Sequence, residues 1–451
     1  MATVDFSRYR RIVQRFWDPE PTNDTCADQP VWCLGLSYTL ATDFYDANTV
    51  TSRASLSSPA SSFQAISESA YNSESAVDQN VPLESSSNGQ PLAAHTGASA
   101  GGGGWPRLFL DDFESRLWMT YRSDFEPIPR SSHPDAVAAL SLPMRVKSQL
   151  VDQNGFSSDS GWGCMIRSGQ SLLANAISAR RLGRSWRRNR DDIGEKSIIA
   201  MFADDQRAPY SIHNFVKHGA ACCGKYPGEW FGPSATARCI QALVNQNETD
   251  LRVYSTGDGP DVYEDEFMNL AKPPGEQFRP TLILVGTRLG IDKITPVYWD
   301  ALIASLQLPQ SVGIAGGRPS SSHYFVGAQG SYLFYLDPHH TRPALRYYSD
   351  PSQYSDEEVD SCHSRRLRKL HVREMDPSML IGFLIKDEDD WVEWRKSIKH
   401  VQGKAVILVS DNNPLSNRNG NNNEAVDDVR SLSEDEYDDS GDVDDEVVVL
   451  N

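Results

Sequence analysis

The chain has 451 residues, 39% of them hydrophobic and 10% aromatic, which is enough for a large folded core in roughly one to three domains. Its net charge of −18 is uneven, because residues 424–451 hold twelve acidic residues and one arginine, which leaves −7 for the rest. A chain without an excess of basic residues gives no support to nucleic-acid binding, and we expect none.

The seven cysteines do not form a recognisable framework. Their number is odd, Cys222 and Cys223 are adjacent, and no Cys-x-x-Cys pair occurs. This argues against a disulfide scaffold and against a structural zinc site. The first residues lack the hydrophobic region of a secretory signal, and no apolar run is long enough to span a bilayer. We therefore expect a cytoplasmic protein without a metal or a transmembrane segment.

Composition divides the chain into parts. One stretch is rich in Ser, Ala, Asn and Gly and has too little apolar surface to offset the entropy of ordering, so we expect it to be disordered. The predicted parts are an N-terminal arm (1–27), the start of the core (28–45), this disordered insert (46–104), the main core (105–410) with a smaller subdomain at about 193–290, and a disordered acidic tail (411–451).

Hydrophobic periodicity predicts alternating helices and strands in the core. The expected helices lie at 113–121, 171–182, 196–203, 235–245, 296–306 and 388–401, and the expected strands at 30–40, 251–254, 281–286, 332–336 and 379–385. A proline-containing loop is expected after Tyr121, and the basic segment 180–192 is expected to be a solvated helix end and loop.

Cys164 stands at a position suited to a nucleophile. It ends the run GWGC at residues 161–164, in a stretch that the helix predicted at 171–182 follows at once. Unpaired N–H groups at a helix start favour a thiolate, which is the reactive form of cysteine. Asp159 or Ser160 would turn or cap the chain at this point. The alternative is a structural cysteine buried at a turn.

A second polar group follows the predicted strand at 332–336. Asp337 and His339 are two residues apart, so in extended backbone both side chains point to one side and His340 points away. A nucleophilic cysteine needs an imidazole as base, and the imidazole needs an acceptor that orients it. The alternative is an Asp-Pro turn with two solvent-facing histidines.

Seven segments occur in the order typical of one enzyme family. They are residues 30–35 (PVWCLG), 115–118 (SRLW), 161–167 (GWGCMIR), 228–233 (GEWFGP), 322–327 (SHYFVG), 335–339 (YLDPH) and 374–377 (EMDP). Together they closely resemble the autophagin family, the cysteine proteases also called autophagy-related protein 4. The resemblance spans residues 28–400 with one insert.

The resemblance implies an α+β, papain-like cysteine protease with a small family-specific subdomain and no cofactor. Cys164 would be the nucleophile, His339 the base and then the acid, and Asp337 the group that holds the imidazole. Tyr121 would assist the oxyanion hole; the alternative is a buried tyrosine bonded to a backbone carbonyl. His323 is the rival histidine for the base.

The resemblance also implies a narrow groove for substrate. Trp230 would form one wall of it, although a core aromatic is the alternative. The glycine-rich run before the SHYF segment would be a gate, with a static turn as the alternative. The gate residues are Gly316, Gly317, Arg318 and Pro319.

The implied substrate is the ubiquitin-like autophagy-related protein 8. Family members trim its C-terminus to a glycine and also hydrolyse the amide that joins this glycine to phosphatidylethanolamine, so the enzyme would meet the membrane through its lipidated substrate. A papain-like hydrolase acting on ubiquitin and a non-catalytic scaffold that binds ubiquitin-like proteins remain the alternatives. In the insert, Phe63 and Ile66 match a short motif that binds the same substrate as an added strand; an inert linker is the alternative.

Overall fold

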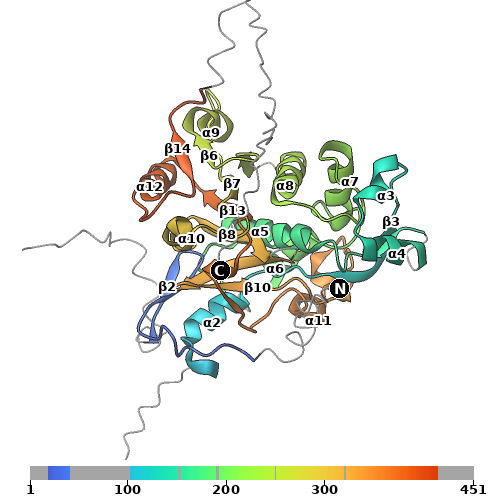
Figure 1. Cartoon of the computed structure of the whole chain (residues 1–451), viewed down its shortest axis with the longest axis horizontal. Coiled ribbons are helices and arrows are strands. Elements are labelled where there is room, and N and C mark those ends of the chain that lie inside the picture. The colour runs from blue at the N-terminus through green and yellow to red at the C-terminus, as the bar shows by residue number, and fades with distance from the viewer. Residues whose placement is uncertain are drawn as a thin grey trace, which may run out of the picture.

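The computed structural model describes residues 19–40, 102–150, 154–188, 192–248, 250–318 and 321–414. Within these residues the largest element is a nine-stranded mixed sheet (Figure 1). Its main path is β12–β10–β9–β8–β13–β7–β5, and β1 joins it by pairing with β9 and β2. The strands are β1 (Val31–Cys33), β2 (Leu36–Tyr38), β5 (Arg252–Ser255), β7 (Thr281–Arg288), β8 (Ser311–Arg318), β9 (Ser321–Gln329), β10 (Tyr332–Leu336), β12 (Lys369–His371) and β13 (Ser378–Ile385).

Neighbouring strands of this sheet are antiparallel, except that β5 and β7 run parallel. Two smaller sheets flank it. One has the order β11 (Arg342–Pro343), β3 (Arg122–Ile128) and β4 (Phe156–Ser158), and the other pairs β14 (Leu408–Ser410) with β6 (Asp261–Tyr263). The mixture of helices and sheets is the α+β class expected from the sequence.

Helices cover both faces of the large sheet (Figure 1). One hydrophobic cluster joins the sheet to the helices α2, α5, α6, α7 and α8, and a second joins it to α9, α10 and α12. The helices are α2 (Arg107–Glu114), α3 (Pro134–Ala139), α4 (Leu142–Leu150), α5 (Cys164–Arg181), α6 (Asp192–Ala200), α7 (Ile212–Cys222), α8 (Pro233–Asn247), α9 (Glu264–Ala271), α10 (Trp299–Ser305), α11 (Asp356–Asp360) and α12 (Glu388–Lys399).

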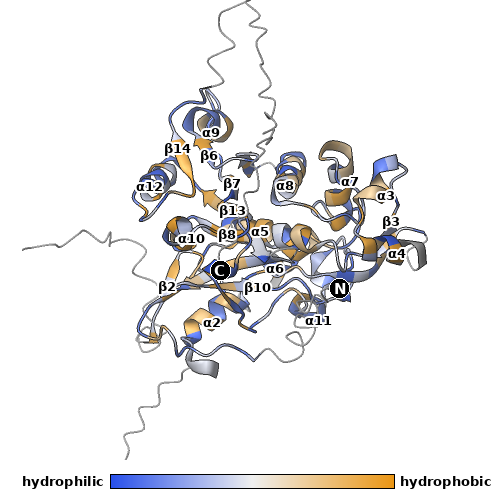
Figure 2. Ribbon diagram, viewed as in Figure 1, coloured by the Kyte–Doolittle hydropathy of each residue, from blue (hydrophilic) through white to orange (hydrophobic). Residues whose placement is uncertain are grey.

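The period-two pattern of β7 explains the two clusters. Leu282 and Leu284 belong to the first, whereas Ile283 and Val285 belong to the second, and all four are fully buried. Side chains alternate between the two faces of a strand, so an apolar strand between two helical layers is buried on both. Strand β13 also has hydrophobic colouring in Figure 2, and its residues 379–385 are all buried. Each such side chain contributes about 1.5–3 kcal/mol by leaving water.

The helix expected at 113–121 is wrong. Helix α2 ends at Glu114, and its apolar residues Phe109 and Phe113 are four apart and fully buried on one face. The chain after it is extended because helix α5 bonds its backbone. Asn175 accepts from the Leu117 N–H at 3.0 Å, and Ser171 accepts from the Met119 N–H at 2.9 Å. The proline loop expected after Tyr121 is instead strand β3, and the helix α7 was not expected.

The basic segment after α5 is not a solvated loop. Its residues Arg184 and Arg187 bond to the buried carboxylate of Asp112, which also pairs with Arg116 and accepts from the Tyr38 hydroxyl. Although burial opposes it, these three guanidinium groups hold the pKa of Asp112 well below its usual range. The segment therefore fastens α5 to α2 and to the N-terminal strands rather than offering free positive charge.

The last residues of the expected insert belong to the described structure. The backbone N–H of Asn23 donates to the carbonyl of Gly103 at 2.8 Å, and Trp105 Nε1 donates to the carbonyl of Pro21 at 2.8 Å. The folded core therefore begins a few residues before Trp105. Residues Phe63 and Ile66 lie outside the described residues.

Candidate active site

Cys164 is the first residue of helix α5, which lies against β8 and β9. The chain turns into the helix through Gly161, whose φ of +94° is the left-handed conformation that glycine favours. The turn is held by backbone bonds, since the N–H groups of Trp162 and Gly163 donate to the Asp159 carbonyl at 3.1 and 2.9 Å. Asp159 therefore turns the chain, as one of the two expectations had it, whereas no side chain caps the helix. The uncapped helix start faces the sulfur with its positive end.

The side chain of Asp159 instead anchors the helix. It lies 2.7 Å from Arg167 Nε, and Arg167 Nη2 lies 2.8 Å from Asp204; these three side chains are at most 1% exposed. Asp159 also accepts from the Arg122 backbone N–H at 2.6 Å. A Cβ on Gly163 would lie 2.5 Å from Asp159 Oδ2, so the carboxylate fits only because residue 163 is glycine. The position of Cys164 is thereby fixed by a buried ion network.

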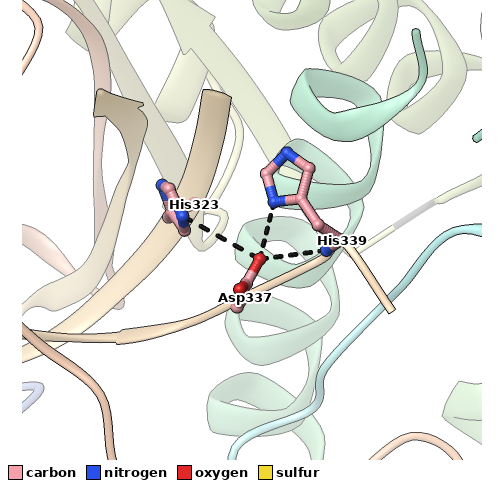
Figure 3. A group of neighbouring side chains, drawn as sticks. All are labelled: His323, Asp337 and His339. Atoms are coloured by element: carbon pink, nitrogen blue, oxygen red, sulfur yellow. Dashed lines mark hydrogen bonds and ion pairs between the residues drawn. The ribbon is translucent and has the colours of Figure 1, made fainter. Parts of the chain in front are cut away.

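Asp337 and His339 lie at the end of β10, and Asp337 Oδ1 accepts from both the backbone N–H and Nδ1 of His339, at 3.0 and 2.6 Å (Figure 3). The side chains thus point to one side, as the spacing predicted, while the ring of His340 packs against Trp118 at 5.8 Å. Although burial opposes it, the bond from His339 brings the pKa of Asp337 well below its usual range. A carboxylate on Nδ1 leaves Nε2 for a second partner.

That partner is Cys164, whose side chain bonds to the His339 imidazole. Burial alone would raise the pKa of Cys164, but the bond to His339 and its charge lower it below the usual value. Burial would lower the pKa of His339, but Asp337 and Cys164 together raise it to about 9. Opposite shifts of this kind favour a thiolate–imidazolium pair, the form in which cysteine is nucleophilic.

Tyr121 lies beside this pair. Its ring meets the His339 ring edge-on at 5.3 Å, and its hydroxyl bonds to Cys164. Burial, with the nearby Cys164 next in importance, raises the pKa of Tyr121, so the phenol keeps its proton and acts as a donor. The backbone of Tyr121 also holds the turn that carries His339, because the Tyr121 N–H donates to the Pro338 carbonyl at 2.8 Å.

His323 also faces Asp337 (Figure 3), with Nε2 3.8 Å from Asp337 Oδ1 and its ring 5.3 Å from that of His339. Burial lowers the pKa of His323 to about 3, so this ring is neutral. The donor atoms of His323, Asp337 and His339 lie within 4.8 Å of one another, the spacing of metal ligands. The two hydrogen bonds from His339 to Asp337 account for the proximity of these two residues.

Four other cysteines differ from Cys164 in their acidity. Burial is the main cause that raises the pKa of Cys33, Cys223, Cys239 and Cys362, in Cys33 to about 12. All seven cysteines are free thiols. A raised pKa leaves little thiolate at neutral pH.

The comparisons with known proteins agree with this geometry. Residues 106–397 match the model of the Peptidase C54 catalytic domain, which covers more than half of the chain. The chain belongs to the C54 peptidase family. It is 58% identical to "Cysteine protease ATG4" of Gibberella zeae over 97% of this chain and 98% of the relative. It is 58% identical to "Probable cysteine protease atg4" of Botryotinia fuckeliana over 97% and 99%, and 55% identical to "Cysteine protease ATG4" of Pyricularia oryzae over 97% and 98%.

This C54 peptidase is therefore a cysteine-type protease with the papain-like α+β fold that the resemblance implied. Its relatives carry the names of autophagy enzymes. In the part of the chain that the structure describes, no helix is both long and apolar enough to cross a membrane.

Three of the four expected gate residues lie in a strand of the C54 domain and not in a loop. Gly316, Gly317 and Arg318 end strand β8 and pair with His323, Ser322 and Ser321 of β9, while Pro319 lies outside the described residues. Trp230 lies in the turn before α8 and is 43% exposed, so it is not a core aromatic. Their roles as gate and groove wall stay predictions.

Three supporting residues were not identified from the sequence. Trp118 Nε1 donates to the backbone carbonyl of Asp337 at 2.9 Å, and Arg167 anchors the helix of Cys164. Ser321 Oγ lies 3.3 Å from His339 Nε2. Trp118 and Arg167 lie inside segments that carried the family resemblance, which is the signal that would have drawn attention to them.

Proposed function

We propose that this C54 peptidase cleaves the C-terminus of the ubiquitin-like autophagy-related protein 8 after a glycine. We propose that it also hydrolyses the amide between this glycine and phosphatidylethanolamine. The observation that carries the proposal is the contact of Cys164 with a histidine whose other ring nitrogen is held by Asp337 at 2.6 Å. The relatives' names and the C54 domain support it.

The reaction is acyl transfer in two steps. The Cys164 thiolate attacks the glycine carbonyl, and when the C–N bond breaks the leaving nitrogen takes the proton of His339 Nε2. Water then attacks the thioester and gives one proton to Nε2. Breaking of the C–S bond regenerates the thiolate and releases a carboxylic acid, which ionises in solvent. Peptide and phospholipid substrates share the same glycine amide, so one site serves both.

The oxyanion of each tetrahedral intermediate would be met by the Tyr121 hydroxyl and the backbone N–H of Cys164. Tyr121 is a donor with a raised pKa, and it already bonds to the sulfur at which the acyl group forms. Donors fixed before the reaction stabilise developing charge without reorganising.

Glycine selectivity would come from a narrow passage to the sulfur. Trp230 supplies a large exposed ring. Gly316 and Gly317 contribute no side chains. A Cβ on Gly316 would lie 2.8 Å from Met379, and a Cβ on Gly317 would lie 2.0 Å from the Ser321 carbonyl oxygen. A passage of this kind would admit glycine and exclude larger residues. The soluble enzyme would act in the cytoplasm and meet membranes through the lipid of its substrate.

The decisive experiment is cleavage of the purified substrate precursor, with ubiquitin carrying a C-terminal extension assayed in parallel. Wild type is expected to cut only the former, and Cys164→Ala to bind the precursor without cutting it, because one small side chain contributes little to packing. If the enzyme cleaved only extended ubiquitin, ubiquitin would replace autophagy-related protein 8 as the proposed substrate. If wild type bound the precursor but never cut it, the protein would be a scaffold. Cleavage that persists in Cys164→Ala would remove the nucleophile assignment.

The insert motif is a separate part of the proposal. Phe63 and Ile66 would add a strand to the substrate's sheet edge and raise its effective concentration near Cys164. Replacing both with Ala should weaken substrate binding in calorimetry and leave the rate at saturating substrate unchanged. Unchanged affinity would make the segment a linker.

A further inference from the structure

We propose that the hydroxyl of Ser321 is a positioning group for the proton on His339 Nε2. This inference rests on the acyl-transfer reaction proposed above and adds a residue to it. Ser321 Oγ lies 3.3 Å from Nε2, the nitrogen that exchanges its proton with the leaving group and with water. Ser321 is the first residue of β9 and is half-buried.

The start of β9 contacts all three members of the candidate triad. Ser321 contacts His339, the Ser322 backbone N–H bonds to the sulfur of Cys164, and His323 lies 3.8 Å from Asp337. Alternate residues of a strand face opposite sides. Ser321 and His323 therefore face the histidine and the aspartate, whereas the Ser322 side chain faces α5, where its Oγ lies 3.0 Å from that of Ser168.

The strand end is itself held in place. Ser321 pairs with Arg318 across the hairpin, and Arg318 forms an ion pair with Glu374 at 3.3 Å. The carbonyl of Gly317 accepts from the Asp376 backbone N–H. The hydroxyl of Ser321 is thus placed by the strand pairing rather than by a freely moving loop.

In the resting site two acceptors, the Cys164 thiolate and the Ser321 hydroxyl oxygen, compete for the proton on His339 Nε2. In the resting pair the imidazolium Nε2–H faces the thiolate and the Ser321 oxygen. Once the thiolate has attacked carbon, the sulfur no longer accepts the proton, and Ser321 remains to hold the N–H toward the leaving nitrogen. After acylation the imidazole is neutral, and a water bonded to the Ser321 hydroxyl is placed to give its proton to Nε2.

Other groups around His339 set its charge. They are Asp337 on β10, Cys164 on α5, Tyr121 before β3 at 5.3 Å and the neutral His323 on β9 at 5.3 Å. Ser321 is uncharged, so replacing it changes no charge in the site. Its removal takes away one acceptor from the imidazolium, which lowers the pKa of His339.

The test compares Ser321→Ala with Ser321→Thr, which restores a hydroxyl, and with Ser352→Ala, which removes an exposed hydroxyl on the turn Pro351–Gln353. Ser321→Ala is expected to lower kcat about tenfold, the lower range for a hydrogen bond to a charged group, with KM nearly unchanged. The alkaline limb of kcat/KM should move to lower pH. Ser321→Thr should recover most of both effects, and Ser352→Ala should match wild type.

A second measurement needs no substrate. The His339 ring is titrated by NMR in wild type and in Ser321→Ala, and its apparent pKa should be lower in the variant. If wild type cleaves nothing but this shift occurs, the proposed function fails and the positioning role stands. An unchanged pKa together with an unchanged pH profile would overturn the role of Ser321, as would a loss of activity that Ser321→Thr does not recover.

Discussion

Asp337 Oδ1 lies 3.8 Å from His323 Nε2 and accepts from His339 Nδ1 at 2.6 Å, so one carboxylate faces two imidazoles of opposite character. His339 has a pKa of about 9 and bonds to Asp337 and Cys164, whereas burial lowers the pKa of His323 to about 3. A buried ring with so low a pKa is a weak base at neutral pH. It can shape the surroundings of the carboxylate.

This difference predicts unequal effects of the histidines. His339→Ala should reduce turnover by several orders of magnitude, because the thiolate and the leaving-group proton both depend on it. His323→Ala and His340→Ala should cost far less, and Asp337→Asn should keep the fold but slow turnover by misorienting the ring. The measurement is kcat on the precursor, with circular dichroism as the control for folding. Equal losses in folded His323→Ala and His339→Ala would contradict the triad.

The two opposed pKa shifts predict a bell-shaped pH profile. Activity should rise as pH passes the lowered pKa of Cys164 and fall through about 9, where His339 loses the proton that the leaving group needs. Alkylation of Cys164 should follow the acid limb alone, because the thiolate persists above it. An alkylation rate that rises only near the pKa of an ordinary thiol would contradict the ion pair.

The same histidine links pH to stability. Its folded pKa lies above its usual value, so the imidazolium is stabilised by folding. This contribution is fully present below about 6.5 and is lost as pH rises through about 9. Urea unfolding of wild type and His339→Ala across this range measures it, and the difference between them should shrink toward high pH.

Tyr121→Phe isolates the phenol donor. The ring keeps its edge-on packing with His339, while the hydroxyl that bonds to Cys164 is lost. Loss of one oxyanion donor costs about 10²–10³ in kcat elsewhere, and we expect a fall toward that range with little change in KM. A change confined to KM would make Tyr121 a substrate-binding residue.

Arg167→Ala should destabilise the fold strongly. It leaves the buried carboxylates of Asp159 and Asp204 without their cation, and breaking such a network costs about 3–5 kcal/mol. Arg207→Ala is the matched control, because its ion pair with Asp205 is exposed and such pairs are worth about 0–1 kcal/mol. Denaturant unfolding compares the two; similar losses would contradict the anchoring role.

The boundary of the insert can be tested by two deletions. Removing residues 46–101 should leave the melting temperature and precursor cleavage near wild type, because this segment has little apolar content. Removing 46–104 also deletes the Gly103 and Gly104 carbonyls that accept from Asn23, and should be less stable. A large loss in the shorter deletion would show that the segment is structural.

The hydrophobic pattern of the sequence correctly predicted the elements that are set by neighbouring residues. Strand β10 was predicted with the bounds Tyr332–Leu336 because its apolar run is short and ends at Asp-Pro, and the spacing of Asp337 and His339 predicted their shared side. The segment around Leu117 was misassigned, since its backbone is held by Asn175 and Ser171, far away in the sequence. No local propensity contains that information.

In the candidate site, too, the features that depend on contacts between distant residues could not be predicted from the sequence. Glycines at 316 and 317 suggested a loop, but pairing with β9 and the close approach of Met379 require small residues in a strand. The link between Ser321 and His339 joins residues from two strand ends, so it appears only once the sheet is assembled. Family resemblance named the reacting residues and implied that Asp337 holds the imidazole, but it gave no distances between them.

Helix α5 has a mechanical consequence for how the site can change. Its 18 residues form a helix about 27 Å long. Arg167 holds the helix near Cys164, and just beyond its C-terminal end Arg184 pairs with the buried Asp112. Moving the sulfur would require shifting the whole helix and disrupting both of these buried ion networks. The sulfur should therefore stay in place when substrate binds, so that the glycine carbonyl has to be brought to it.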